Sequence, residues 1–186
     1  MIFSETAVDG AYVIDLEPIP DDRGFFARAF CADEFAAHGL TTKVAQCNLS
    51  LSAQRGTLRG MHYQVAPHQE AKLVRCTRGC FYDVCLDLRP DSPTFTQWIG
   101  AELSAENRRA LFVPEGCAHG FLTLEDDTEI YYQISEAYAP DAQRGVRYDD
   151  PAFDIDWPGE VLHIKPRDAE YPDFDPEAFA VPGRVR

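Results

Sequence analysis

The chain is a succession of short strand-like segments with turn-forming residues between them, which restricts it to folds built mainly from β-sheet. Runs rich in β-branched and aromatic residues include AYVIDL, KLVRCTRG, CFYDVCLDLR, ALFVP, GFLTL and EIYYQIS, with Gly, Pro and Asp clusters between them. This spacing is typical of antiparallel strands. The sequence therefore predicts an all-β sandwich or barrel.

Helical patterns are few and short. Residues 32–39 (ADEFAAHG) read as a helix ending at Gly39, a turn is predicted after Ser104, and residues 175–179 (DPEAF) form a third short stretch. None of them is long enough to make a helical layer.

The length of 186 residues favours one domain, which we place at residues 1–186. The segment from about residue 170 to the C-terminus is acidic and rich in proline. We expect it to wrap around the domain or to fray.

A formal net charge of −14 argues against a general nucleic-acid binder or a protein of anionic membrane surfaces, because both partners are polyanions. Any bound anion would need a local basic cluster. The N-terminal residues show no basic and apolar signal pattern, and no run approaches the ~20 apolar residues that span a bilayer. We expect a soluble cytoplasmic protein.

The six cysteines include no C-x-x-C pair, and most lie in strand-like apolar runs. This placement favours reduced cysteines in the core, with a zinc site or disulfides as the alternatives.

The PEGCAH run, from Pro114 to His119, has the spacing P-x-G-x-x-H and resembles the second motif of the cupin jelly rolls. The corresponding first-motif positions are His62, Gln64, Glu70 and Gly79. An amide stands where a cupin usually has a second ligand imidazole, and amides are poor ligands for transition metals. We therefore predict no metal, with a site made by His62, Glu70 and His119 as the alternative.

Several further runs resemble one cupin family, the dTDP-4-dehydrorhamnose 3,5-epimerases. They are DDRGFF, QCNLS, LRGMHYQ, KLVRCTRG, DVCLDLRPDSPTF, LSAEN, VPEGCAHGF and YYQISEAYAP, followed by DDP and DWP, in the family's order from about residue 12 to 170. The resemblance implies a cupin-type jelly-roll sandwich or barrel with a few short helices. It also implies an isomerase that needs no cofactor.

The C–H bonds on either side of the carbonyl of a 4-keto sugar are acidic, so a base, an acid and a cation that holds the enolate are sufficient for epimerisation. The resemblance implies His62 as the base, Tyr132 as the acid and Lys72 as the group at the enolate oxygen. It pairs His62 with the carboxylate of Asp168, while Asp83 stays open as a second possible partner.

The same resemblance implies a set of substrate-binding residues: Arg23, Arg28, Gln46, Asn48, Arg59, His119, Tyr138, Gln143 and Arg167. Arginine side chains suit the oxygens of a diphosphate. Arg28, Gln143 and Arg167, together with Glu70, depart from the commonest family residues. The substrate is expected to be a dTDP-linked 4-keto-6-deoxy hexose, while CDP or GDP as the nucleotide, and epimerisation at one centre rather than two, stay open.

Each of these residues also has a purely structural interpretation. Tyr132 shares strand parity with Ile130 and Ile134 and could be a core tyrosine, and Lys72 could be a solvated lysine at a sheet edge. A silent sugar-nucleotide binder therefore remains an alternative to an enzyme. The family also implies a homodimer in which residues near Arg23 approach the neighbour's pocket.

Overall fold

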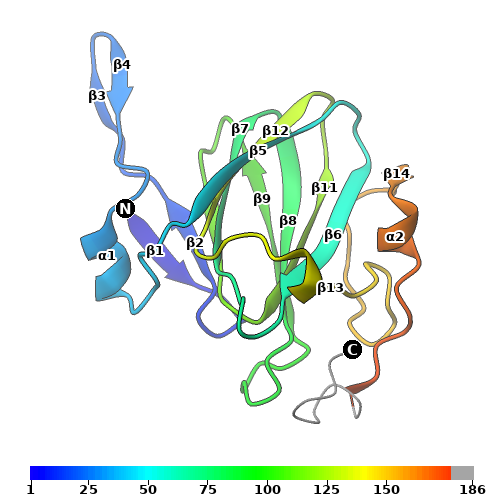
Figure 1. Cartoon of the computed structure of the whole chain (residues 1–186). Helices are drawn as coiled ribbons and strands as arrows, with labels where there is room; N and C mark the ends of the chain where they lie inside the picture. Colours follow the sequence, from blue (N-terminus) through cyan, green and yellow to red (C-terminus); the bar gives the residue numbers. More distant parts are fainter. Residues whose placement is uncertain (177–186) are drawn as a thin grey trace.

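The computed structural model describes residues 1–176, so most of the third predicted helix, residues 175–179, lies outside the described residues. Strands dominate the chain (Figure 1). They are β1 (Ile2–Glu5), β2 (Tyr12–Asp15), β3 (Ile19–Asp21), β4 (Gly24–Phe26), β5 (Gln46–Ser52), β6 (Thr57–Gln64), β7 (Lys72–Arg78), β8 (Cys80–Asp87), β9 (Trp98–Ser104), β10 (Ala110–Val113), β11 (Cys117–Thr123), β12 (Thr128–Ile134), β13 (Gln143–Gly145) and β14 (His163–Ile164).

Two sheets face each other as a jelly roll. The first has the strand order β1-β2-β10-β7-β12-β5, and the second has the order β13-β6-β11-β8-β9 with β14 added beside β6. All pairings are antiparallel except that of β14 with β6. The predicted all-β cupin-type fold is confirmed.

The inner faces of the two sheets form the main core. On β12, Ile130 is fully buried and Tyr132 packs against the same cluster, while the intervening Tyr131 faces outward toward Leu49 of β5. On β7, Val74 and Cys76 contribute to this core. Alternation along these two neighbouring strands of the first sheet thus directs every second side chain inward.

The helices are short, as expected. Helix α1 (Ala32–Ala37) buries Phe35, and Gly39 follows it with a φ of +70°. The predicted turn after Ser104 is present, because the Ser104 hydroxyl accepts the backbone N–H of Asn107 and the side-chain oxygen Oδ1 of Asn107 accepts the backbone N–H of Ser104. A 3-10 helix, η1 (Pro140–Ala142), and the four-residue helix α2 (Pro166–Ala169) were not predicted. No helix among residues 1–176 is long and apolar enough to cross a membrane.

The hairpin of β3 and β4 extends away from the two sheets (Figure 1). The guanidinium of Arg108 lies 4.7 Å from the centre of the Phe25 ring. The hairpin nevertheless exposes Ile19 and Phe26, at 65% and 71% of their surface.

The described part of the tail lies against the domain. The Phe174 ring is 4.8 Å from that of Phe153, and the Phe174 N–H donates to the carboxylate of the buried Asp150. Up to residue 176 the tail therefore packs against the rest of the chain.

All six cysteines are free, and four of them are buried. This agrees with the expectation of reduced core cysteines.

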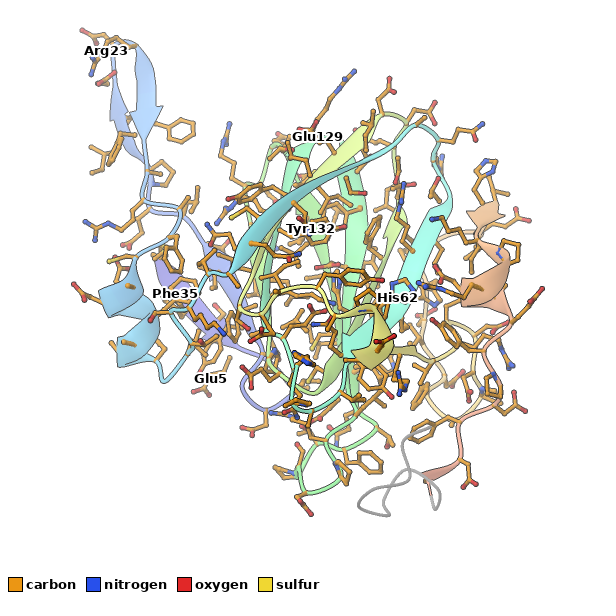
Figure 2. All side chains as sticks on the ribbon, in the orientation of Figure 1. Glu5, Arg23, Phe35, His62, Glu129 and Tyr132 are labelled. Carbon is orange, nitrogen blue, oxygen red and sulfur yellow. The ribbon has the colours of Figure 1, made fainter. Side chains whose placement is uncertain are left out.

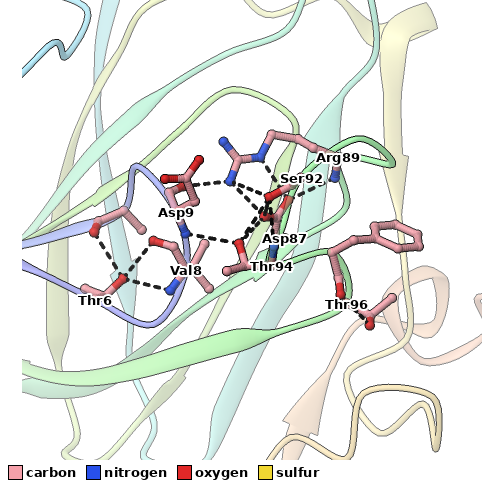
Figure 3. A network of polar contacts seen from close by, with 10 residues as sticks. Thr6, Val8, Asp9, Asp87, Arg89, Ser92, Thr94 and Thr96 are labelled. Atoms are coloured by element: carbon pink, nitrogen blue, oxygen red, sulfur yellow. Dashed lines mark hydrogen bonds and ion pairs between the residues drawn. The ribbon is translucent and has the colours of Figure 1, made fainter.

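A buried polar cluster closes the loop between β8 and β9 (Figure 3). The carboxylate of Asp87 accepts hydrogen bonds from Arg89, Ser92 and Thr94, and Arg89 also donates to the carbonyl of Asp9. Burial alone would raise the pKa of Asp87, but these donors outweigh it and lower the pKa to about 2. The loop is thereby tied to the segment between β1 and β2.

Candidate active site

A cavity of about 520 Å³ opens between the two sheets. Its walls come from β5, β6, β7, β11 and β12, with residues of α2 and the β12–β13 connection at one side. The structure brings these sequence-predicted residues together around it: Gln46, Asn48, Arg59, His62, Lys72, His119, Tyr132, Tyr138, Gln143, Arg167 and Asp168.

His62 is held by Asp168. The Nε2 atom of His62 lies 2.8 Å from Oδ1 of Asp168, whose side chain is only 3% exposed. Burial alone would raise the pKa of Asp168, but the hydrogen bond and charge of His62, the Gly60 N–H and Arg167 outweigh it and lower the pKa. The carboxylate therefore stays ionised and fixes the orientation of the imidazole.

The second open carboxylate, Asp83, has a different partner. Its Oδ1 atom lies 2.6 Å from Nε2 of His119 on β11, and both side chains are buried. His119 is the direct cross-strand partner of His62. Two histidines, each tied to its own buried aspartate, thus stand side by side on β6 and β11.

An irregularity in β6 places both Arg59 and His62 in the cavity. His62 pairs with His119 and Arg59 pairs with Phe121, so three steps on β6 match two steps on β11. The extra residue is accommodated at Gly60, which has a φ of +130° and leaves no room for a Cβ, because that atom would lie 2.4 Å from Cα of Gly120. Such a bulge redirects a side chain that simple alternation would point the other way.

Lys72 begins β7, which lies between β10 and β12 and is therefore not an edge strand. Its side chain is 9% exposed, and its ammonium lies 3.1 Å from the carboxylate of Glu70 and donates to the backbone carbonyl of His62 at 3.3 Å. The interpretation of Lys72 as a solvated edge lysine is wrong. Its charge is instead held next to the backbone of His62.

Tyr132 enters the cavity from β12, which lies beside the strand of Lys72 and in the sheet opposite to that of His62. Its ring meets that of His119 edge-on at 6.2 Å. Burial and the nearby charge of Asp83 raise the pKa of the Tyr132 phenol, although Arg59 and a hydrogen bond with Ser50 act in the other direction. The phenol therefore keeps its proton at neutral pH. Figure 2 shows Tyr132 on β12 and His62 on β6, in the two sheets that face each other.

Gln64 has a structural role. Its amide donates to the carbonyls of His68 and Ala137, and its carbonyl accepts the N–H of Ala139 at 2.6 Å. These hydrogen bonds hold in place the segment that follows β12 and contains Tyr138. The Gln64 side chain is buried. The amide thus stabilises a loop where a metal-binding cupin would have a ligand.

The alternative metal ligands are engaged elsewhere. His62 is bonded to Asp168, Glu70 to Lys72 and His119 to Asp83. Within residues 1–176, no three His, Cys, Asp or Glu side chains are arranged to hold a metal ion.

A second group of polar side chains lies at the outer side of the cavity. The Tyr138 hydroxyl donates to the side-chain oxygen Oε1 of Gln143 at 2.7 Å, and the guanidinium of Arg167 approaches the same atom at 3.4 Å. The side-chain oxygen Oε1 of Gln46 accepts the Tyr138 N–H. The exposed Tyr138 ring and the Arg167 cation thus lie near each other at the entrance, next to the His62–Asp168 pair.

Arg23 and Arg28 do not line the cavity of their own chain. Arg23 lies at the tip of the β3–β4 hairpin (Figure 2), where it pairs with Asp21, and Arg28 pairs with Glu34 of α1. Arg28 was expected among the substrate-binding residues, but within this chain it lies outside the cavity. Roles for both arginines in binding remain predictions that depend on a second chain.

Sequence reasoning missed some cavity residues. Ser50 could have been found, because it follows Gln46 and Asn48 at every second position of β5, and all three line the cavity. Lys165 also lines the cavity, next to α2, and no pattern marked it.

The comparisons with known proteins agree with this geometry. The family model for dTDP-4-dehydrorhamnose 3,5-epimerase matches residues 5–176. The dTDP-4-dehydrorhamnose 3,5-epimerase of Sinorhizobium fredii is 42% identical over 164 residues, which cover 88% of this chain and 84% of that protein.

Solved structures extend the likeness to the fold. The crystal structure of dTDP-4-dehydrorhamnose 3,5-epimerase from Elizabethkingia anophelis has a TM-score of 0.91 at 34% identity, covering 94% of this chain and 96% of that one. An epimerase structure from Legionella pneumophila in complex with dTDP-4-keto-L-rhamnose has a TM-score of 0.83 at 38% identity, covering 90% and 89%. With sequence, fold and pocket in agreement, the chain belongs to the dTDP-4-dehydrorhamnose 3,5-epimerase family.

Proposed function

We propose that this protein epimerises a dTDP-linked 4-keto-6-deoxy hexose, converting dTDP-4-dehydro-6-deoxy-D-glucose to dTDP-4-dehydro-L-rhamnose. One observation carries the proposal: an imidazole held by a buried carboxylate and a protonated phenol line one cavity from opposing sheets. Family membership supports the isomerase activity. The L. pneumophila complex supports dTDP over CDP or GDP as the nucleotide.

His62 removes the proton next to the ketone, and Asp168 stabilises the imidazolium that forms. Charge then moves to the ketone oxygen, where the buried ammonium of Lys72 holds it. Tyr132 returns a proton to the carbon from the other side. The raised pKa of the Tyr132 phenol suits this role, because the acid is protonated when the enolate appears.

The basic residues of the cavity form the local cluster that an acidic protein needs to bind an anion. Arg59 and Arg167 face the diphosphate, with Gln46 and Asn48 beside them. Tyr138 stacks on the base, with Gln143 bonded to its hydroxyl. His119 contacts the sugar.

The active form is proposed to be a homodimer. Exposed large apolar side chains include two on β5, Leu49 at 65% and Leu51 at 52%, and those of the β3–β4 hairpin. An exposed edge strand and a projecting apolar hairpin are features that a second copy would cover. Arg23, at the hairpin tip, would then reach the neighbour's cavity.

The test is turnover of dTDP-4-dehydro-6-deoxy-D-glucose in heavy water, followed by proton NMR, with the CDP- and GDP-linked sugars alongside. We expect inversion and deuterium uptake at C3 and C5 with the dTDP sugar. Uptake at only one carbon would identify a single-centre epimerase. His62→Asn should abolish uptake at both carbons, whereas Tyr132→Phe should retain exchange while inversion is lost.

Binding without exchange in the unaltered protein would instead support the silent binder. Exchange that requires an added divalent metal would favour the metal-dependent alternative. Deuterium uptake that survives His62→Asn would overturn the assignment of the base.

A further inference from the structure

Asp83 is a carboxyl group in the middle of the apolar core. It lies on β8 between Phe81 and Cys85 at inward-facing positions, and both neighbours belong to the main hydrophobic cluster. Its side chain is completely buried. Burying a carboxylate costs free energy that an apolar side chain would not, so packing alone does not account for Asp83.

Only half of the carboxyl group is satisfied. Oδ1 is bonded to His119, whereas Oδ2 is buried with no hydrogen-bond partner among residues 1–176. The polar groups that face it come from three strands: His119 on β11, Lys72 on β7 and Tyr132 on β12. Burial raises the pKa of the Asp83 carboxyl against the opposing effects of His119 and Lys72.

His119 connects this carboxyl group to the cavity. The ring lines the cavity and touches Tyr132, and its Nε2 atom is taken by Asp83. Among the described residues no other group is bonded to the ring, so Nδ1 is the nitrogen left for a ligand. Whether Nδ1 of His119 is a hydrogen-bond donor or an acceptor therefore depends on how many protons the Nε2–Asp83 pair and the ring hold, and on which atoms carry them.

We propose that Asp83 is a positioning residue that makes His119 a hydrogen-bond donor to the ketone oxygen of the substrate, through a proton held on Nδ1. This inference rests on the proposed function. The pair is then neutral overall: either Asp83 keeps its proton and donates to Nε2, or it is ionised beside a doubly protonated ring. In both arrangements Nδ1 carries a hydrogen.

The third arrangement is disfavoured. An ionised Asp83 beside a ring protonated only at Nε2 leaves a net negative charge in the core and turns the lone pair of Nδ1 toward the oxygen where enolate charge develops. Lys72 already neutralises Glu70 at 3.1 Å. A donor at Nδ1 instead gives the oxygen two donors, His119 and Lys72, which is how enzymes stabilise such charge.

The direct test is the protonation state of His119, read from two-bond proton–nitrogen NMR spectra of protein labelled with ¹⁵N-histidine, free and with dTDP bound. We expect the chemical shift of a nitrogen that carries a hydrogen at Nδ1 of His119 in both states. The signals that are missing from the His119→Gln variant identify those of His119. A bare Nδ1 in both states would overturn the proposal, and this outcome does not depend on whether the protein turns over the proposed substrate.

Kinetics give a second, independent test. Asp83→Leu removes the proton source and should lower kcat about 100-fold, with KM within about twofold and no loss of thermal stability. Asp83→Asn can donate its amide hydrogen to Nε2 and should restore kcat to within about fivefold of the unaltered enzyme. Asp87→Asn, a buried carboxyl on the same strand outside the cavity, is the matched control and should leave kcat unchanged.

An Asp83→Leu variant with unaltered kcat would overturn the proposal, as would an Asp83→Asn variant as slow as Asp83→Leu. Absence of turnover in the unaltered protein would count against the proposed function alone, because the NMR measurement would still decide the state of His119.

Discussion

In the proposed mechanism, Asp168 decides how well His62 can work as a base. Its carboxylate is buried and accepts from the imidazole at 2.8 Å, so it both orients the ring and stabilises its charged form. Asp168→Asn keeps the size of the side chain and removes the charge. We expect kcat to fall about 10³-fold while the affinity for dTDP, measured by calorimetry, changes little.

Glu170→Gln is the matched control, because Glu170 is an exposed carboxylate just after the same helix. It should leave kcat unchanged. An Asp168→Asn enzyme within tenfold of the unaltered rate would show that the imidazole needs no carboxylate.

At the scale of elements, the Asp87 cluster makes the β8–β9 connection sensitive to acid (Figure 3). The pKa of the Asp87 carboxyl is lowered from the usual 3.8 to about 2, so this group binds a proton less readily in the folded state than in the unfolded chain. The contribution of Asp87 to stability is therefore complete above about pH 5 and is lost as the pH falls toward 2, by about 2 kcal/mol.

We expect Asp87→Asn to remove this pH dependence. The difference in unfolding free energy between the unaltered protein and Asp87→Asn, measured with urea, should shrink steadily from pH 5 to pH 3. Asp91→Asn, an exposed carboxylate in the same loop, provides the comparison and should show a small and constant difference. If the difference in unfolding free energy between the unaltered protein and Asp87→Asn does not vary with pH, Asp87 is not the source of the acid sensitivity.

Gly60 makes the bulge that turns His62 into the cavity, and its substitution tests that element. A Cβ there would lie 2.4 Å from Cα of Gly120 and 2.8 Å from the His119 carbonyl, so the two strands would have to separate. We expect Gly60→Ala to lower the free energy of unfolding by roughly 3 kcal/mol and to reduce kcat strongly.

Substitution of Gly24 separates the two causes of the expected loss of stability, which are the unfavourable backbone conformation and the contact of the new Cβ with Gly120. Gly24 has a φ of +133°, close to the +130° of Gly60, but a Cβ there would meet nothing within 4 Å. Gly24→Ala therefore reports the cost of the backbone conformation alone. Equal losses of stability in the two variants would show that the contact with Gly120 is unimportant.

The bulge also shows where sequence-based prediction reached its limit. Alternation correctly placed Tyr132 with Ile130 and Ile134, because β12 is regular from Ile130 to Ile134 and its register shift against β7 lies before Ile130. The same rule applied to β6 puts Arg59 and His62 on opposite faces, since an extra residue in one strand shows only in its pairing with β11. The motif LRGMHYQ carried that information through family resemblance, not through periodicity.

Other features could not be read from one strand at a time. Whether Asp168 or Asp83 holds His62 was left open, because the answer depends on a contact across 106 positions of the chain. Helix α2 has only four residues, too few for a periodic pattern. The role of Gln64 was likewise hidden, since its partners are backbone groups of a distant loop.

At the scale of the whole molecule, the cavity of each chain holds all the residues proposed for proton transfer, whereas Arg23 lies away from it. The hairpin carries Arg23 away from the two sheets, with the side chain 89% exposed (Figure 2). If a partner's cavity receives it, catalysis and binding are divided between two copies of the chain.

Mixed dimers test this division. Arg23→Ala should raise KM about tenfold without changing the size of the assembly in light scattering, and His62→Asn should be inactive. When the two variants are expressed together, a mixed dimer holds one cavity with both His62 and Arg23 intact. About one quarter of all cavities should then behave as in the unaltered enzyme at low substrate, because half of randomly formed dimers are mixed. If activity in the mixture is only the sum of the separately expressed variants, Arg23 does not serve the neighbouring cavity.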